Sequence, residues 1–192
     1  MKDSIKQFLL LNFPMKIWII CHPFTARKAN IISINAKKIS EEMIFDPNLD
    51  GLFSGGQVDA FRHIFWMATL TQQIGAKRTR SLGEAHEKGN KSDFDNKTLE
   101  DNYLPDFISC KMDLLNNEIG INIGKANLHA DYESLKEIIK FEIISGNAFI
   151  IKRNKNKEFL SQTNKILKEI DYNGKWFNPK TIVKSDFQLI NL

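Results

Sequence analysis

The sequence predicts a mainly α protein, a single-domain helical bundle over residues 1–192 with a small β-hairpin near the C-terminus. The main evidence is that apolar residues recur at spacings of three and four along several segments, which is the period of an amphipathic helix. The composition, with 42% hydrophobic and 26% charged residues, is ordinary for a globular protein. A chain of this length can form one core and is short for two. We expect a motif-bearing core over about 15–125, followed by a helix, the hairpin and a tail over 126–192.

The first two predicted helices lie in the most apolar part of the chain. Residues 3–13 predict a helix that Pro14 breaks or kinks, because proline lacks the amide hydrogen that a helix interior needs. The apolar stretch 17–24 then leads into a longer helix over about 23–43. Pro23 suits the first turn of that helix, where its fixed φ is already helical.

This apolar region is not expected to cross a membrane. Its longest uninterrupted apolar run, residues 17–21, is far shorter than the roughly 20 residues of a membrane-spanning helix. No pair of small residues marks a signal-peptide cleavage site behind it. We therefore expect no transmembrane segment and a protein that is cytoplasmic or exported without a cleavable signal peptide.

Glycine and proline residues then divide the chain. The stretch FDPNLDGLFSGGQ, residues 45–57, predicts a loop. The central helix follows and is expected to end at Gly75, a residue type typical of helix C-termini. A shorter helix is expected over 76–88, closed by Gly89-Asn90. The polar stretch 91–106 is expected to be a mobile connection or a lid, and the residues do not decide between the two.

The last predicted elements are two helices and the hairpin. Residues 108–124 and 132–145 predict helices from their apolar spacing. Residues 148–151 and 159–160 predict the two hairpin strands, because they are rich in β-branched and aromatic residues. The polar residues 154–157 predict the turn between them.

The charge and the cysteines exclude some classes of protein. The net charge of +4 is modest, and the basic clusters at 77–80 and 152–157 are interpreted as solvated surface. A nucleic-acid-binding face would concentrate basic and aromatic residues together, so nucleic acid is not an expected partner. Cys21 and Cys110 lack the spacing of a zinc site. Free thiols are the favoured interpretation, and a single disulfide between them stays open.

The central helix carries the most informative pattern, VDAFRHIFWMATL over residues 58–70. Spacings of three, four and seven residues place Asp59, Arg62, His63 and Trp66 on one face, opposite an apolar face that suits the core. An exposed tryptophan in this column would leave a large apolar side chain in water. We therefore expect that the polar face is also covered and that its groups bind one another or a ligand.

A second polar set lies in KMDLLNNEIGINIG, residues 111–124. On a helix, Asp113 and Asn117 share one side with Gly120 and Gly124. Glycine costs about 1 kcal/mol in a helix interior, so its presence there needs a reason in packing or in ligand binding. Two glycines four residues apart leave a groove in which another helix can approach closely.

Together these motifs resemble those of an uncharacterised bacterial domain family. The resemblance is carried by DAFRH followed by Trp66, by Ala85-His86-Glu87, and by Met112-Asp113-Leu114 with Asn116, Asn117 and Gly120. It spans roughly residues 15–125. The family occurs as small stand-alone proteins and as the C-terminal module of larger secreted or toxin-like proteins. The resemblance implies a mostly helical domain but no activity. The site positions that it implies are Asp59, Arg62, His63, His86, Glu87, Asp113 and Asn117.

The residues of these motifs predict a site for a divalent metal ion. Imidazoles and carboxylates that project inward from several helices commonly build metal sites in bundles. The expected ligands are Asp59, His63, His86 and Asp113. His63, Glu87 and Asp113 are the expected catalytic groups, because a general base beside a metal-bound water supports hydrolysis. Arg62 and Asn117 are expected to bind the substrate. No HExxH motif is present, so the prediction rests on the combination of residues.

Two functional hypotheses follow. The first is a small helical hydrolase, metal-assisted or with His63 as the base without metal, that acts as a toxin-like effector on a small-molecule or polymer substrate. The second is a non-catalytic binding module in which the same residues form a structural polar network. In that module the apolar N-terminus or the hairpin would bind a protein partner.

Overall fold

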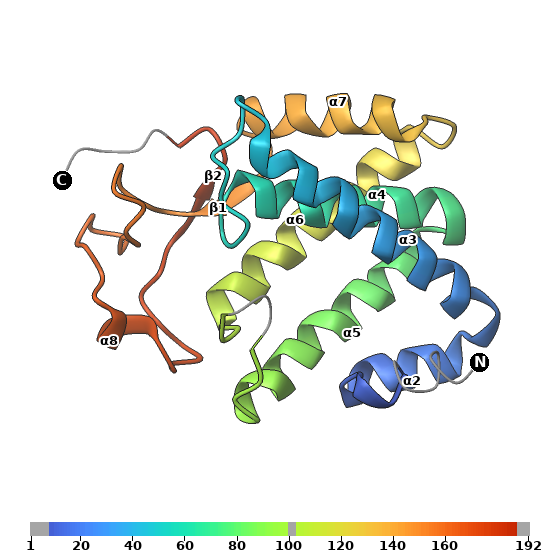
Figure 1. The fold of residues 1–192 in the computed structure, drawn as a ribbon, viewed down its shortest axis with the longest axis horizontal. Coiled ribbons are helices and arrows are strands. Elements are labelled where there is room, and N and C mark those ends of the chain that lie inside the picture. The colour runs from blue at the N-terminus through green and yellow to red at the C-terminus, as the bar shows by residue number, and fades with distance from the viewer. Residues whose placement is uncertain (1–7, 100–102, 188–192) are drawn as a thin grey trace.

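The structure is a computed structural model that describes residues 8–99 and 103–187. It is mainly α, with one small antiparallel sheet near the C-terminus, as the sequence predicts (Figure 1). None of the described helices combines the length and hydropathy that a membrane crossing needs. In chain order the elements are α2 (Phe13–Cys21), α3 (Pro23–Glu42), η1 (Met43–Phe45), α4 (Gln57–Ile74), α5 (Ala76–Asp95), α6 (Phe107–Ala126), α7 (Tyr132–Ile144), β1 (Phe149–Ile151), α8 (Glu169–Tyr172) and β2 (Ile182–Lys184).

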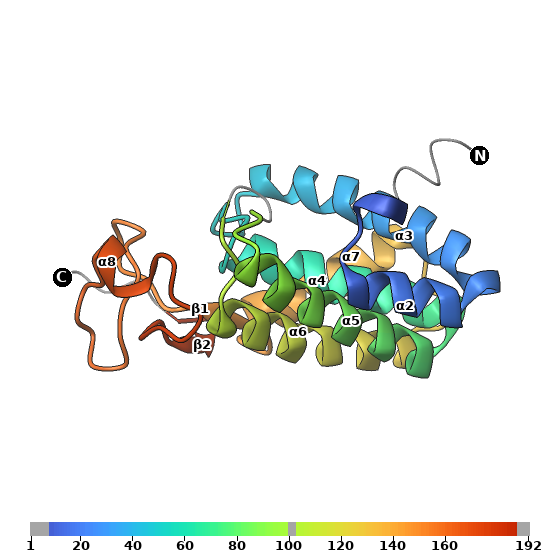
Figure 2. The ribbon, with the colours of Figure 1, turned by 90° about the horizontal axis from the view of Figure 1, so that it is seen from below.

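Helix α4 lies at the centre of the fold, between α3 and α6, and also packs against α5 and α7 (Figures 1 and 2). Phe61 and Phe65 on its apolar face are completely buried. The polar face is covered as well, because α3 and α6 pack over it. The indole Nε1 of Trp66 donates a hydrogen bond of 2.7 Å to Ser33 Oγ of α3. The prediction that both faces of the central helix are covered is therefore confirmed.

The two glycines of α6 allow this helix to lie directly against α4. A Cβ atom at Gly120 would be 2.3 Å from the carbonyl oxygen of Ile64, and one at Gly124 would be 2.5 Å from that of Ala68. Both distances are far below van der Waals contact, so no larger residue fits without moving the backbone. The predicted groove is confirmed, and it holds the polar residues of α6 beside those of α4.

The predicted end of α5 is wrong. The helix continues through Gly89 and Asn90 to Asp95 instead of ending there. Gly89 serves packing, because a Cβ atom at this position would lie 2.1 Å from Nδ2 of Asn12. Asn12 caps the N-terminus of α2 with its side-chain oxygen, which accepts a 3.3 Å hydrogen bond from the Met15 amide. Glycine thus lets the start of α2 lie against α5.

The N-terminal helix is predicted over residues 3–13, and residues 3–7 of that range lie outside the described residues. Residues 8–10 are helical, and α2 begins a few residues later at Phe13. Pro14 lies in the first turn of α2, so it begins a helix after interrupting the preceding one. Cys21 at the end of α2 is exposed, Cys110 in α6 is buried, and no disulfide joins them.

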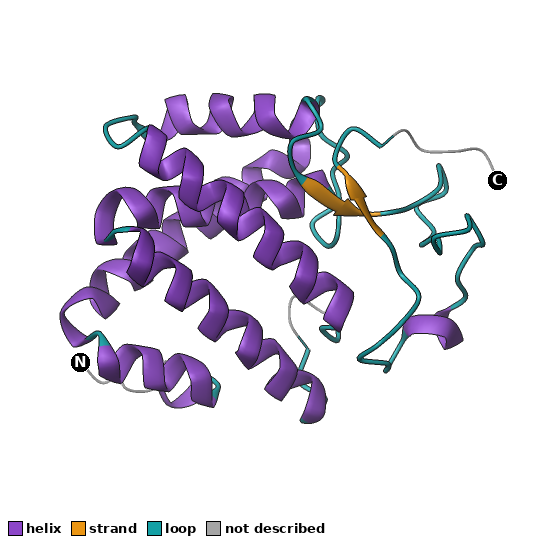
Figure 3. Ribbon diagram, turned by 180° about the vertical axis from the view of Figure 1, so that it is seen from behind, coloured by secondary structure: helices purple, strands orange, loops and turns teal. Residues whose placement is uncertain are grey.

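The hairpin prediction is correct for the first strand and wrong for its partner. β1 pairs in antiparallel register with β2, Phe149 opposite Lys184 (Figure 3). The predicted partner, residues 159–160, forms the isolated bridges Arg153–Phe159 and Leu160–Ile166 and no pair with β1. The tail folds back because side chains hold it there. Ser185 Oγ donates a 2.6 Å hydrogen bond to the carbonyl oxygen of Ile143. Such pairing over a long chain separation leaves no local pattern in the sequence.

An ion pair between η1 and α7 gives a testable pH dependence. Asp46 Oδ2 lies 2.7 Å from Lys140 Nζ, with side chains 10% and 16% exposed, and this contact lowers the pKa of Asp46 from 3.8. The stabilisation is present above the unfolded pKa near 3.8 and is lost as the pH falls through the folded pKa. We expect Asp46→Asn to lower the free energy of unfolding by about 0.5–1 kcal/mol at pH 7. The difference should vanish on acidification.

Urea denaturation of both proteins from pH 7 to pH 2 measures this difference. Glu137→Gln is the control, because Glu137 also contacts Lys140, at 3.4 Å, but its side chain is 72% exposed. The control should differ little from the wild type at any pH. If the loss of stability in Asp46→Asn stays constant down to pH 2, the substitution acts through the geometry of the loop and not through the charge of Asp46.

Candidate functional site

The side chains of three residues meet between α4 and α6. They are Asp59 and His63 of α4 and Asp113 of α6. His63 Nε2 lies 3.7 Å from Asp59 Oδ1 and 3.3 Å from Asp113 Oδ1. Metal–ligand bonds of about 2.1 Å place tetrahedral ligand atoms about 3.4 Å apart, close to these separations. The three residues are buried, at 4%, 3% and 6% exposure. Over residues 8–99 and 103–187 this is the single group of three such side chains with spacing suited to a metal ion, so it could hold one.

Asn117, one turn beyond Asp113, fixes the orientation of His63. Its side-chain oxygen lies 3.2 Å from His63 Nδ1. A hydrogen on Nδ1 would donate to this oxygen and leave Nε2 to face the two aspartates. This tautomer is the one that a ligating histidine needs. Asn117 is expected from the sequence to bind substrate, but it lies behind His63 and does not line the cleft described below.

The loop before α4 and the next turn of α4 hold Asp59. Its Oδ2 accepts a 2.6 Å hydrogen bond from the amide of Gly55, whose φ of 69° favours glycine. Its Oδ1 accepts a 2.6 Å hydrogen bond from Arg62 Nη2. The carboxylates of Asp59 and Asp113 both face the His63 ring, and carboxylate and imidazole groups are common ligands of divalent cations.

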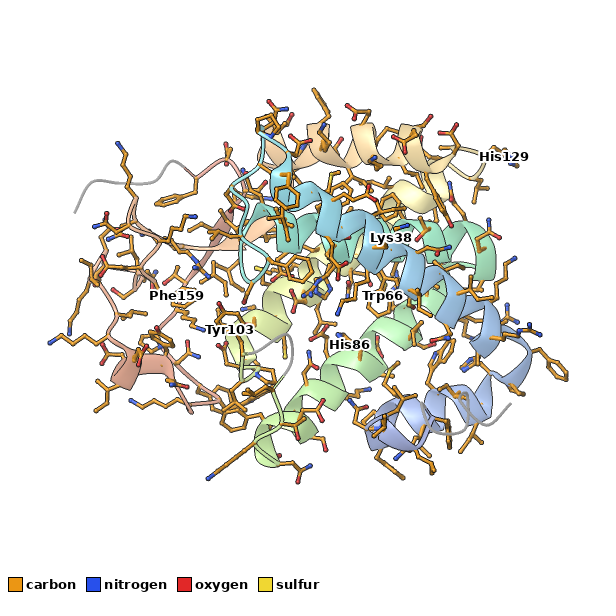
Figure 4. All side chains as sticks on the ribbon, in the orientation of Figure 1. Lys38, Trp66, His86, Tyr103, His129 and Phe159 are labelled. Carbon is orange, nitrogen blue, oxygen red and sulfur yellow. The ribbon has the colours of Figure 1, made fainter. Side chains whose placement is uncertain are left out.

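A cleft of about 360 Å3 opens over this group, and Asp59, Arg62 and Asp113 line it. This volume lies within the range of small-molecule sites. The cleft is lined by the helices, by Tyr103 of the connection between α5 and α6, and by Phe159 of the C-terminal segment (Figure 4). The aromatic residues that line the cleft are Phe53, Phe94, Tyr103, Phe159 and Tyr172.

His86, an expected metal ligand, lies outside the three-residue group. The centre of its ring lies 6.4 Å from the centre of the His63 ring. The His86 ring also contacts the Trp66 ring edge-on, with the two ring centres 5.4 Å apart (Figure 4). His63 and His86 line a second hollow of about 320 Å3 with Trp66. Glu87, an expected general base, is 5% exposed, and its Oε2 accepts a 3.1 Å hydrogen bond from Asn90. Asn90 in turn lines the main cleft.

An ion pair that the sequence does not reveal closes one wall of the cleft. Lys180 Nζ lies 2.7 Å from Asp106 Oδ2, with side chains only 9% and 5% exposed. Asp106 also caps α6, because its Oδ1 accepts hydrogen bonds from the amides of Ile108 and Ser109. An aspartate directly before a helix is a recognisable N-cap signal. The pairing with Lys180 has no such signal, because the two residues lie far apart in the sequence.

Comparison with known proteins assigns the helical part of the chain to a family. The sequence model of a domain of unknown function, DUF6973, matches residues 16–147. No curated protein and no solved structure matches the chain. The matched range contains Asp59, His63 and Asp113, whereas Phe159 and Lys180 of the cleft wall lie beyond it. Because the match covers more than half of its length, the chain belongs to the DUF6973 family.

Proposed function

We propose that the protein is a small helical hydrolase that uses a divalent metal ion held by Asp59, His63 and Asp113. The observation that carries this proposal is the buried group of three ligand side chains, two of which, Asp59 and Asp113, line a cleft large enough for a small molecule. A network that served stability alone would need no such opening. When bound, the ion would polarise a substrate oxygen and lower the pKa of a bound water.

The chain's own residues prepare the site. The side-chain oxygen of Asn117 lies 3.2 Å from His63 Nδ1, which suits ligation through Nε2, and the amide of Gly55 holds one oxygen of Asp59. Arg62 lies over the ring of Phe53, with Cζ 4.7 Å from its centre, and lines the cleft. Its guanidinium is therefore placed to donate hydrogen bonds to a substrate oxygen. The aromatic walls exclude water and strengthen these interactions.

The role of Glu87 in catalysis stays a prediction, as does the action as a toxin-like effector, which rests on the sequence resemblance alone. The alternative is a non-catalytic module, and the 2.6 Å contact between Arg62 and Asp59 favours it as a second candidate. In that case the polar face is a structural network, and its residues stabilise the packing of α4 against α6.

Metal binding tests the proposal first. The purified protein is stripped with a chelator and titrated with Zn²⁺, Mn²⁺ and Mg²⁺, with calorimetry and thermal unfolding as readouts. We expect at least one ion to stabilise the wild type, by about 2.7 kcal/mol at a hundredfold excess over its Kd. His63→Ala should abolish this gain. His86→Ala is the matched control and should retain it, since His86 lies outside the group. A wild type that gains nothing from any ion contradicts the metal centre.

Hydrolysis is tested next on chromogenic carboxylic esters, phosphomonoesters and phosphodiesters. We expect turnover of one class that disappears with chelator and returns with the ion that binds. His63→Ala should be inactive at every metal concentration. Metal binding without turnover of any class would give the ion a structural role and reject the hydrolase.

A further inference from the structure

Arg153 is a cation in the C-terminal segment that the chemistry above leaves unused. Its Cζ lies 4.0 Å from the centre of the Phe159 ring, and Nη2 donates a 2.8 Å hydrogen bond to the carbonyl oxygen of Ser54. Nη1 donates a 3.3 Å hydrogen bond to the carbonyl oxygen of Lys157. Its Nε is buried and has no hydrogen-bond acceptor within the described part of the chain. The guanidinium thus contacts carbonyl groups and a ring.

The interpretation of residues 152–157 as solvated surface is wrong for Lys152 and Arg153. Lys152 is only 8% exposed, and Arg153 is partly buried. The interpretation as solvated surface is correct for Lys155 and Lys157, which are exposed. The sequence could not separate these four residues, because the fold of the tail over this turn decides which of them it covers.

The charge of Arg153 is not neutralised by an ion pair. Over residues 8–99 and 103–187, no carboxylate lies within 4.0 Å of its guanidinium. Burial lowers the pKa of Arg153, while the charges of Asp50 and Asp59 act in the opposite direction. Asp59 is already bound by Arg62, and Asp50 accepts hydrogen bonds from the amides of the loop before α4. Buried charges in proteins are normally paired, so this guanidinium suits an anionic ligand.

Arg153 lies next to the cleft. It lines a hollow of about 510 Å3 that shares Phe53, Ser54 and Tyr103 with the cleft above the Asp59–His63–Asp113 group. Its Nη2 binds the carbonyl oxygen of Ser54, and the amide of the next residue, Gly55, binds Asp59. The remaining charged residues of this hollow are one lysine and one glutamate, Lys37 and Glu41, which offset each other.

We propose that Arg153 binds an oxyanion of the substrate, a phosphate or a carboxylate group, beside the Asp59–His63–Asp113 group. The planar guanidinium offers parallel N–H donors that match two oxygens of such a group. This inference rests on the proposed function and narrows it to anionic substrates. Arg153 lies outside the matched range 16–147, so the specificity belongs to the C-terminal segment and not to the family-matched region.

Binding of inorganic phosphate and of acetate to the full chain tests the proposal. Both are titrated at constant ionic strength against chloride, into protein that has been stripped with a chelator and then dialysed, so that neither a metal ion nor the carboxylates of the chelator contribute. Calorimetry and thermal unfolding are the readouts. We expect phosphate, acetate or both to bind and stabilise the wild type beyond chloride. The stronger of the two anions identifies the substrate group. Arg153→Gln should weaken that binding by about tenfold or more, since it removes hydrogen bonds to a charged group.

Arg80→Gln is the matched control, because Arg80 is exposed and already binds Glu118 through two hydrogen bonds. It should bind the anion as the wild type does. Arg153→Lys keeps the charge without the paired donors and should bind more weakly than the wild type. If Arg153→Gln does not fold, Arg153→Lys decides, and an affinity equal to the wild type's overturns the proposal. Equal effects of phosphate, acetate and chloride on the wild type overturn it as well.

The two proposals fail separately. Loss of anion binding with intact metal binding would reject the role of Arg153 and leave the metal centre. Loss of metal binding with intact, Arg153-dependent anion binding would reject the metal-assisted hydrolase and leave an anion-binding site.

Discussion

Asp113→Asn is expected to weaken divalent metal binding by about a hundredfold or more and to leave the metal-free protein at least as stable as the wild type. Residues that only orient a ligand contribute about 10- to 100-fold to metal affinity, so loss of a charged ligand should reach the upper end of that range. Asparagine keeps the shape of the side chain. It also relieves the repulsion between the buried carboxylates of Asp59 and Asp113, which lie close together when no ion separates them.

Isothermal titration with the ion that binds the wild type measures the affinity, and urea denaturation in EDTA measures the stability. Glu118→Gln is the matched control, because it removes one carboxylate from α6 at an exposed position. It should leave the metal affinity unchanged and should change the free energy of unfolding by no more than about 1 kcal/mol. A loss of several kcal/mol in metal-free Asp113→Asn, with no metal effect on the wild type, would establish the structural network instead.

Gly120→Ala is expected to lower the free energy of unfolding by about 2–3 kcal/mol and to abolish metal binding. The added Cβ would lie 2.3 Å from the carbonyl oxygen of Ile64 and 2.8 Å from the Cβ of Met67, so α4 and α6 must move apart. Overpacking of this kind costs about 1–3 kcal/mol and more where backbone resists. Alanine gains about 1 kcal/mol of helix propensity over glycine, which offsets only part of the loss. Separation of the helices also pulls Asp113 away from His63.

Gly89→Ala is the matched comparison, since it makes the same substitution inside α5. The three atoms nearest to the added Cβ all belong to the side chain of Asn12, which can rotate away. The cost is then limited to the N-cap of α2, about 1 kcal/mol, and the helix propensity of alanine compensates for much of it. Circular dichroism during urea denaturation gives both values. A Gly120→Ala protein as stable as the wild type would contradict the close helix contact.

The candidate site is built from both the matched region and the C-terminal segment. Asp59, His63 and Asp113 project from α4 and α6 inside the matched range, whereas much of the opposite cleft wall comes from the chain after β1. The Lys180–Asp106 pair joins that wall to the first turn of α6, the helix that carries Asp113. Changes in the C-terminal segment are therefore expected to alter which molecules enter the cleft, and to leave the ligand geometry unchanged.

By itself, the sequence determined the mainly α class, the groove at Gly120 and Gly124 in which another helix can lie, and the burial of the polar face of the central helix. These features follow from local periodicity and from the size of single residues, as at Gly120. The sequence also indicated His63, Asp59 and Asp113 as members of one site, from their helical spacing and from the motifs that carry the family resemblance.

Only the tertiary structure decided which of the predicted ligands meet. His63 joins the two aspartates while His86 turns toward Trp66, because the packing of α5 against α4 sets that direction. Contacts between distant parts of the chain also decide the pairing of β1 with β2, the burial of the Lys180 side chain and the partial burial of Arg153. Spacing along one helix predicts which side chains share a face, but the packing of separate elements decides which faces come together.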